Sequence, residues 1–200
     1  MRLSPLAAAL TLLASTPASA SASGVEGEGG FMRGLLHPAL GFEHFMAMAA
    51  VGLLSVQLGG RALLIAPATL FVFLTTGGAL GAAGVPFPEI RGAAALSILA
   101  IGLAIAMRTA TPQALALLVV GVFALLHGHA HFYTAPYNAD PPGPAAQAIY
   151  AAGFLIGSAA LHLLGVGIGL LQNDRGARAL LGAGVAGVGL HIALLTFGVV

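Results

Sequence analysis

The feature that most constrains this chain is a succession of six long apolar segments, separated by short polar or Pro/Gly-rich stretches. A helix that crosses a bilayer needs about 20 mostly apolar residues. Only 6% of the residues are charged, whereas soluble domains carry roughly 25%. We therefore expect an all-α fold, a polytopic membrane protein with a bundle of about six transmembrane helices after an N-terminal signal peptide. The expected spans are residues 38–58, 62–82, 92–107, 112–132, 145–171 and 177–199.

The first twenty residues have the layout of a secretory signal peptide. Arg2 supplies a positive start, residues 6–14 form a short apolar stretch, and Ala-Ser-Ala at 18–20 is a small-residue cleavage site. The alternative is an uncleaved first transmembrane helix. The expected parts are a signal peptide at 1–20, a short external lead-in at 21–36 and a six-span domain at 37–200.

The placement of arginines predicts the orientation. Cleavage of the signal outside would leave the mature N-terminus there, and six spans would return the C-terminus to the same side. The loops that then face the cytoplasm hold four arginines, against two outside, as the positive-inside rule requires. We expect a multi-pass protein of the bacterial inner membrane, with both termini on the periplasmic side. The inner arginines are Arg61, Arg108, Arg175 and Arg178, and the outer ones are Arg33 and Arg91.

Composition excludes several classes of protein and of site. The formal net charge is +1 and no lysine is present, so we expect no nucleic-acid partner. Because the chain has no cysteine, a metal site must use His, carboxylate, Met or backbone oxygen. Small residues let helices approach closely in lipid, so glycines inside the spans predict tight helix packing. These glycines include Gly165, Gly167, Gly169, Gly182, Gly184, Gly187 and Gly189.

The first span begins with two histidines and a carboxylate, His37, Glu43 and His44. Such side chains are costly at membrane depth and usually serve ions or protons there. If one helix includes both histidines, their spacing of seven places the two rings on one stripe, together with Gly41 and Met48. Pro38 suits the first turn of that helix, where its missing N–H matters least.

A second cluster, His127, His129 and His131, ends the fourth span. His127 and His131 are four residues apart and can converge on one ion, whereas His129 points away from them in a continuous helix. Because spans one and four run in opposite directions, both clusters fall in the outer half of the membrane. Neutral imidazoles with one carboxylate suit Ni, Co, Zn or Cu, while Ca or Mg would require more oxygen ligands.

Three further residues are candidates for an ion pathway. His162 and His191 lie deeper in later spans, and the alternative for each is a hydrogen bond to a neighbouring helix. Met48 follows the first motif; a thioether can ligate a soft ion, but it also fills apolar cores.

The two motifs, His-Pro-Ala-Leu-Gly-Phe-Glu-His at 37–44 and His-Gly-His-Ala-His at 127–131, resemble those of the HupE/UreJ family of nickel/cobalt permeases. The signal peptide and six spans are also similar to this family. The resemblance implies uptake of nickel or cobalt to supply metalloenzymes. There are two departures: Glu43 stands where the family usually has Asp, and Phe132-Tyr133-Thr134 replaces a frequent Gly-x-Glu.

Together these features predict a secondary permease that imports a divalent transition metal, Ni²⁺ first and Co²⁺ second, through an outward-facing His/Glu site. We expect no enzyme activity and no prosthetic group; the ion is cargo, and the other partner is the lipid bilayer. A homo-oligomer is compatible with the sequence, and the energy source is left open. The alternatives are a membrane-embedded zinc-dependent hydrolase and a non-transporting metal-binding assembly factor. The predicted metal-binding residues are His37, Glu43, His44, His127, His129 and His131.

Overall fold

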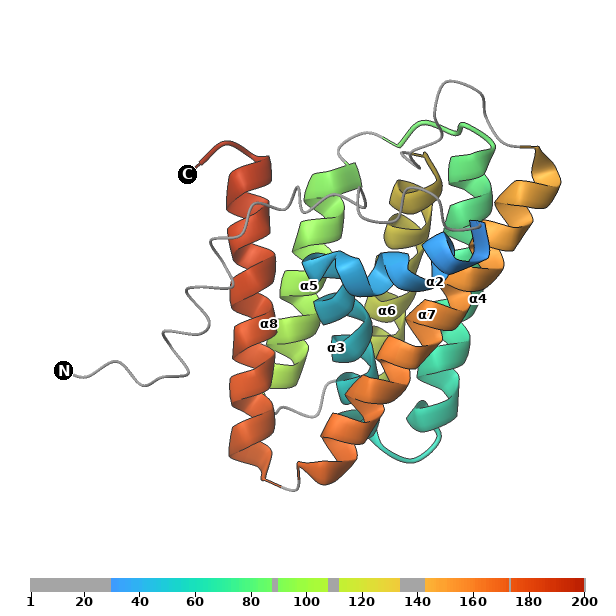
Figure 1. The fold of residues 1–200 in the computed structure, drawn as a ribbon. Coiled ribbons are helices and arrows are strands. Elements are labelled where there is room, and N and C mark those ends of the chain that lie inside the picture. Colours follow the sequence, from blue (N-terminus) through green and yellow to red (C-terminus); the bar gives the residue numbers. More distant parts are fainter. Residues whose placement is uncertain (1–29, 88–89, 108–111, 134–142, 173, 200) are drawn as a thin grey trace.

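The computed structural model describes residues 30–87, 90–107, 112–133, 143–172 and 174–199. All regular secondary structure in these residues is helical (Figure 1), which confirms the all-α prediction. The predicted signal peptide at 1–20 lies outside the described residues. The helices are α2 (Gly30–Leu40), α3 (Phe42–Leu58), α4 (Ala62–Ala82), α5 (Ile90–Ala106), α6 (Gln113–Tyr133), α7 (Pro144–Leu171) and α8 (Arg175–Thr196).

Each expected span corresponds to one helix or to a pair of helices. By length and apolar composition α4, α6, α7 and α8 can each cross a membrane, and the bent pair α2 and α3 makes a fifth candidate. The remaining expected span is α5, a shorter apolar helix. The surface is rich in exposed apolar side chains such as Leu64, Leu171 and Leu180, which suits contact with lipid. The chain is therefore a multi-pass membrane protein.

The first expected span is not one continuous helix. The prediction of a single helix over residues 38–58 was therefore wrong. The axes of α2 and α3 differ by 78°, with Gly41 at the break. Gly41 is extended (φ −88°, ψ 110°), and Pro38 lies inside α2 rather than in a first turn. Proline removes a helical N–H and crowds the preceding turn, which favours ending a helix nearby. Figure 1 shows α2 lying across the bundle, after which α3 runs along it.

Reciprocal glycines hold the helices close together in pairs. A Cβ on Gly52 of α3 would meet the backbone of α7, and a Cβ on Gly165 of α7 would meet the backbone of α3. Gly77 and Gly128 are related in the same way between α4 and α6. The glycine-packing prediction is thus confirmed for part of the set. The packed members are Gly165, Gly169, Gly182 and Gly189, whereas Gly167, Gly184 and Gly187 have no atom near enough to touch an added Cβ.

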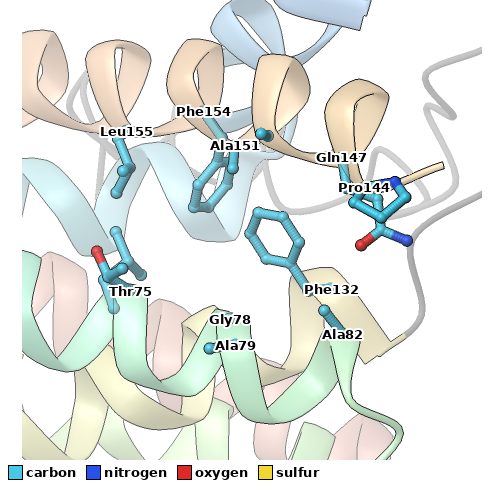
Figure 2. A pocket seen from close by; sticks show the side chains of 12 residues that line it. Thr75, Gly78, Ala79, Ala82, Phe132, Pro144, Gln147, Ala151, Phe154 and Leu155 are labelled. Carbon is cyan, nitrogen blue, oxygen red and sulfur yellow. The ribbon is translucent and has the colours of Figure 1, made fainter. Parts of the chain in front are cut away.

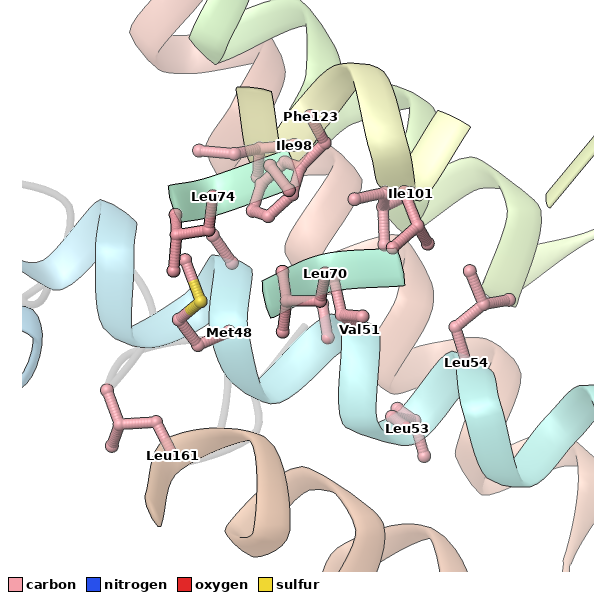
Figure 3. Close-up of a cluster of buried hydrophobic side chains, with 14 of the residues drawn as sticks. Met48, Val51, Leu53, Leu54, Leu70, Leu74, Ile98, Ile101, Phe123 and Leu161 are labelled. Atoms are coloured by element: carbon pink, nitrogen blue, oxygen red, sulfur yellow. The ribbon is translucent and has the colours of Figure 1, made fainter. Parts of the chain in front are cut away.

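The apolar core is built around α3. Figure 3 shows Met48 of α3 next to Leu74 of α4 and Val51 of α3 next to Leu70 of α4, with Phe123 of α6 near Leu74. Met48, Val51 and Phe123 are fully buried, and Leu74 nearly so. Helix α3 also packs against α5, α7 and α8. Helix α3 is therefore surrounded by helices from both halves of the chain.

Candidate metal-binding site

Four imidazole rings meet where α2, α3 and α6 come together. His37 is on α2, His44 is near the start of α3, and His127 and His131 are on α6. The ring centroids of His44 and His131 are 3.8 Å apart. Those of His37 and His131 are 4.8 Å apart, and those of His44 and His127 are 5.5 Å apart. Two motifs more than eighty residues apart in sequence thus form one group, here called the histidine cluster.

The break between α2 and α3 positions the first two rings. His37 and His44 do not share a helical stripe, yet their ring centroids are 6.1 Å apart because the chain turns between them. A Cβ on Gly41 would lie 2.8 Å from Nδ1 of His44. Real Cβ atoms essentially never approach so closely, so a side chain at position 41 would require the His44 ring to move from its place against the break.

The hydrogen bond of His127 identifies which of its nitrogens can bind a metal. Its Nδ1 lies 3.1 Å from the carbonyl oxygen of Phe123, one turn earlier in α6. A carbonyl oxygen can only accept, so Nδ1 carries the proton and donates it. In a neutral ring the lone pair is then on Nε2. A partner that holds one ring nitrogen in this way is the usual support of a metal-binding histidine.

Tyr150 of α7 holds one ring nitrogen of His37, and no sequence motif had pointed to this tyrosine. Its hydroxyl oxygen lies 3.0 Å from Nδ1 of His37, which leaves Nε2 of that ring for another partner. Tyr150 is buried. The sequence feature that could have indicated this role is a tyrosine in the early turns of an apolar helix. A buried tyrosine hydroxyl normally requires a hydrogen-bond partner.

Aromatic rings enclose the histidine cluster. Phe123 stacks against His127 with ring centroids 4.1 Å apart, and Phe154 of α7 lies 4.6 Å from His131. Phe123 and Phe154 are buried. Apolar walls exclude water, so charges inside interact more strongly than they would in solution.

The cluster is assembled but its donor atoms are not aimed at one point. The ring pairs His37–His131 and His44–His127 meet edge to face, at 83° and 80°. Within the described residues, no three His, Cys, Asp or Glu side chains are arranged so that they could hold a metal ion. Nε2 of His131 is buried and has no hydrogen-bond partner there. Side-chain rotation within this group would be needed before three nitrogens shared an ion.

Glu43 lies in the first turn of α3, directly before His44, and is half-buried. A carboxylate at this position is favoured by the N-terminal end of the helix dipole. It supplies a negative charge in the same turn as a cluster histidine.

His129 lies apart from the cluster. Helix α6 continues through it, so its ring points away from His127 and His131, as helical geometry predicts. Its Nε2 is 2.6 Å from the carbonyl oxygen of Val85, and its ring centroid is 5.3 Å from that of Phe87. The structure thus places His129 against the segment that follows α4.

The three pathway candidates fall in different environments. His162 is buried on α7, and Met48 is completely buried in the apolar core around α3. His191 is exposed on α8, which places it on the perimeter of the bundle rather than inside it.

Comparisons with known proteins agree with the motifs and the fold. Residues 8–192 match the family described as HupE / UreJ protein. The chain is 36% identical over 164 residues to Protein HupE of Rhizobium leguminosarum bv. viciae, covering 82% of each protein. No solved structure matches the chain. A match over nearly the whole length, together with a relative of this identity and coverage, shows that the chain belongs to the HupE/UreJ family.

Proposed function

We propose that this protein imports a divalent transition metal across the bacterial inner membrane, with Ni²⁺ as the first candidate and Co²⁺ as the second. The family is associated with nickel and cobalt uptake. The observation that carries the proposal is the convergence of His37, His44, His127 and His131 from separate helices. His127 and His131 are buried, and His37 and His44 are half-buried. Imidazoles gathered inside a membrane bundle are costly and are typical of an ion site.

The cluster would replace part of the hydration shell of the arriving ion. His127 presents Nε2 as the acceptor nitrogen, since its Nδ1 donates to the backbone, and His37 does the same in the tautomer whose Nδ1 donates to Tyr150. Neutral imidazole binds Ni²⁺, Co²⁺, Zn²⁺ and Cu²⁺, and affinity alone would favour Cu²⁺. Selectivity would therefore come from the geometry that the rings adopt around the ion. Glu43 adds negative charge beside His44 and lowers the cost of bringing a dication into the site.

His129 has a different role in this proposal. Its hydrogen bond to Val85 ties the end of α6 to the segment after α4. This contact fixes the helix that carries His127 and His131. We therefore assign His129 to holding the cluster in shape, and we assign metal binding to the four converging histidines with Glu43.

Uptake of radiolabelled Ni²⁺ tests the proposal. Cells without their own nickel transporters would express the wild-type chain, the His37→Ala/His44→Ala double variant, or His191→Ala as a matched control on the perimeter. Immunoblots of isolated membranes would confirm equal amounts of each protein. We expect uptake with the wild type and the control, and background uptake with the double variant.

Competition by unlabelled Co²⁺ and Zn²⁺ in the same assay would rank the metals. Normal uptake by a well-inserted double variant would overturn the site assignment. Absence of uptake by a well-inserted wild type, with all three metals tested, would overturn the transport function itself.

A further inference from the structure

Two buried polar side chains on α7 have no hydrogen-bond partner within the described residues. The Oγ of Ser158 and both ring nitrogens of His162 are buried and unpartnered. The exposed fractions are 0% for Ser158 and 2% for His162. Burying a polar group without a hydrogen-bond partner is energetically unfavourable. A pair of such side chains, four residues apart on one helix, is therefore typical of a site that a ligand completes.

These two residues lie inward of the histidine cluster. Tyr150, Phe154, Ser158 and His162 follow one another at four-residue intervals on α7. Tyr150 bonds to His37, and Phe154 contacts His131, so the upper part of this series touches the cluster. A helix rises about 1.5 Å per residue, which places Ser158 about 6 Å and His162 about 12 Å deeper than Phe154.

A cavity reaches along the same side of α7. It has a volume of about 260 Å³ and lies between α4, α6 and α7 (Figure 2). Ala151, Phe154 and Leu155 line its α7 side, and Ser158 and His162 follow Phe154 at four-residue intervals, one and two turns beyond the last lining residues. Figure 2 shows the rings of Phe154 and Phe132 projecting into this space.

Phe154 lies on α7 between Tyr150, which contacts the histidine cluster, and the deeper residues Ser158 and His162. Its ring packs against His131 on one side and borders the cavity on the other. The cavity gives the ring room to rotate without movement of a helix. Ser158 lies one turn after Phe154 on α7, so rotation of this ring would remove the side chain that separates His131 from that turn.

From this geometry we propose that His162, with Ser158, is an inner binding station for the divalent metal in transit. The inference rests on the proposed import function. One imidazole nitrogen and one hydroxyl oxygen provide fewer ligands than the four-histidine cluster, so the ion is held more weakly here and keeps more of its water. Conduction requires sites that bind well enough to admit the ion and weakly enough to release it. A strong outer site followed by a weaker inner site meets this requirement.

The test separates transport from binding at the outer cluster. His162→Leu removes the imidazole and keeps an apolar side chain of similar size, and Ser158→Ala removes the hydroxyl. We expect His162→Leu to lower the maximal rate of Ni²⁺ uptake at least about tenfold, equivalent to about 1.4 kcal/mol in the barrier. Calorimetry with Ni²⁺ on the purified protein in detergent should give an unchanged outer affinity, while a second, weaker binding event seen in the wild type disappears.

If His162 had a purely structural role, His162→Leu would lower thermal stability and would not change Ni²⁺ uptake per folded protein. The proposal predicts lost uptake without lost stability. Replacing an unpartnered buried polar group by an apolar one should leave stability equal or higher. Loss of uptake at unchanged thermal stability therefore supports the proposal, and unchanged uptake in a His162→Leu protein that still requires His44 overturns it. Where His162→Leu does not insert, His162→Gln gives the same comparison, because its amide is neutral and has no imidazole nitrogen. A wild type that takes up no Ni²⁺ overturns the import function, and with it this inference.

Discussion

The packing of α7 against α3 can be tested by two alanine substitutions placed two residues apart. A Cβ on Gly165 would lie 2.7 Å from the carbonyl carbon and 2.8 Å from the Cα of Ala49, whereas ordinary contact begins at 3.4 Å. The helices would have to separate by at least about 0.7 Å, the difference between 3.4 and 2.7 Å. A Cβ on Gly167 would meet nothing within 4 Å.

The expected magnitude follows from comparing the two variants. Both Gly165→Ala and Gly167→Ala gain the same helix propensity, up to about 1 kcal/mol, so this contribution cancels in the difference. What remains is the cost of overpacking at Gly165, typically about 1–3 kcal/mol. We therefore expect Gly165→Ala to be less stable than Gly167→Ala by this amount, which is about a 5- to 150-fold difference in the unfolding constant.

Reversible unfolding in mixed micelles measures this difference. The purified variants would be titrated with SDS, and helix content would be followed by circular dichroism. Because Ala49 lies five residues after His44 on α3, separation of the helices should also reduce Ni²⁺ uptake in Gly165→Ala. Equal stability of the two variants would refute the inference that close backbone contact at Gly165 holds these helices together.

Four further outcomes are expected. Tyr150→Phe removes the hydroxyl that holds Nδ1 of His37, and calorimetry should show Ni²⁺ affinity about 10- to 100-fold weaker, with uptake loss greatest at low Ni²⁺. His129→Ala should lower thermal stability in detergent because the bond to Val85 is lost, while Ni²⁺ stoichiometry stays unchanged. Asp174 caps α8 by accepting from two backbone N–H groups, so Asp174→Ala should cost about 0.5–2 kcal/mol in the same SDS titration, without changing Ni²⁺ affinity. Lowering the pH from about 8 to about 5 should weaken Ni²⁺ binding, because ligand imidazoles must be neutral; affinity independent of pH would count against a histidine site.

Helix positions followed closely from the sequence. The expected span at 62–82 has the bounds of α4, and the one at 145–171 differs from α7 by one residue. This agreement has a simple cause, since the lipid core requires long apolar segments and the backbone must satisfy its own hydrogen bonds. The break at Gly41 was not foreseen, because a continuous apolar run does not show which Pro or Gly bends it.

The sequence by itself determined which polar side chains lie within long apolar segments, and from these it predicted the metal-binding residues. Charged and imidazole groups are costly within a membrane, and the alternation of spans predicted that both motifs lie on one side. The residues singled out in this way were His37, Glu43, His44, His127 and His131. The sequence also predicted that His129 would point away, since a continuous helix turns it to the other face.

Only the tertiary structure decided how these residues meet. The 78° bend brings His37 to His131, and α7 supplies Tyr150 and Phe154 around them. The same packing leaves Ser158 and His162 buried without partners. Hydropathy acts on each segment alone, whereas these contacts depend on which glycines let one helix backbone lie against another.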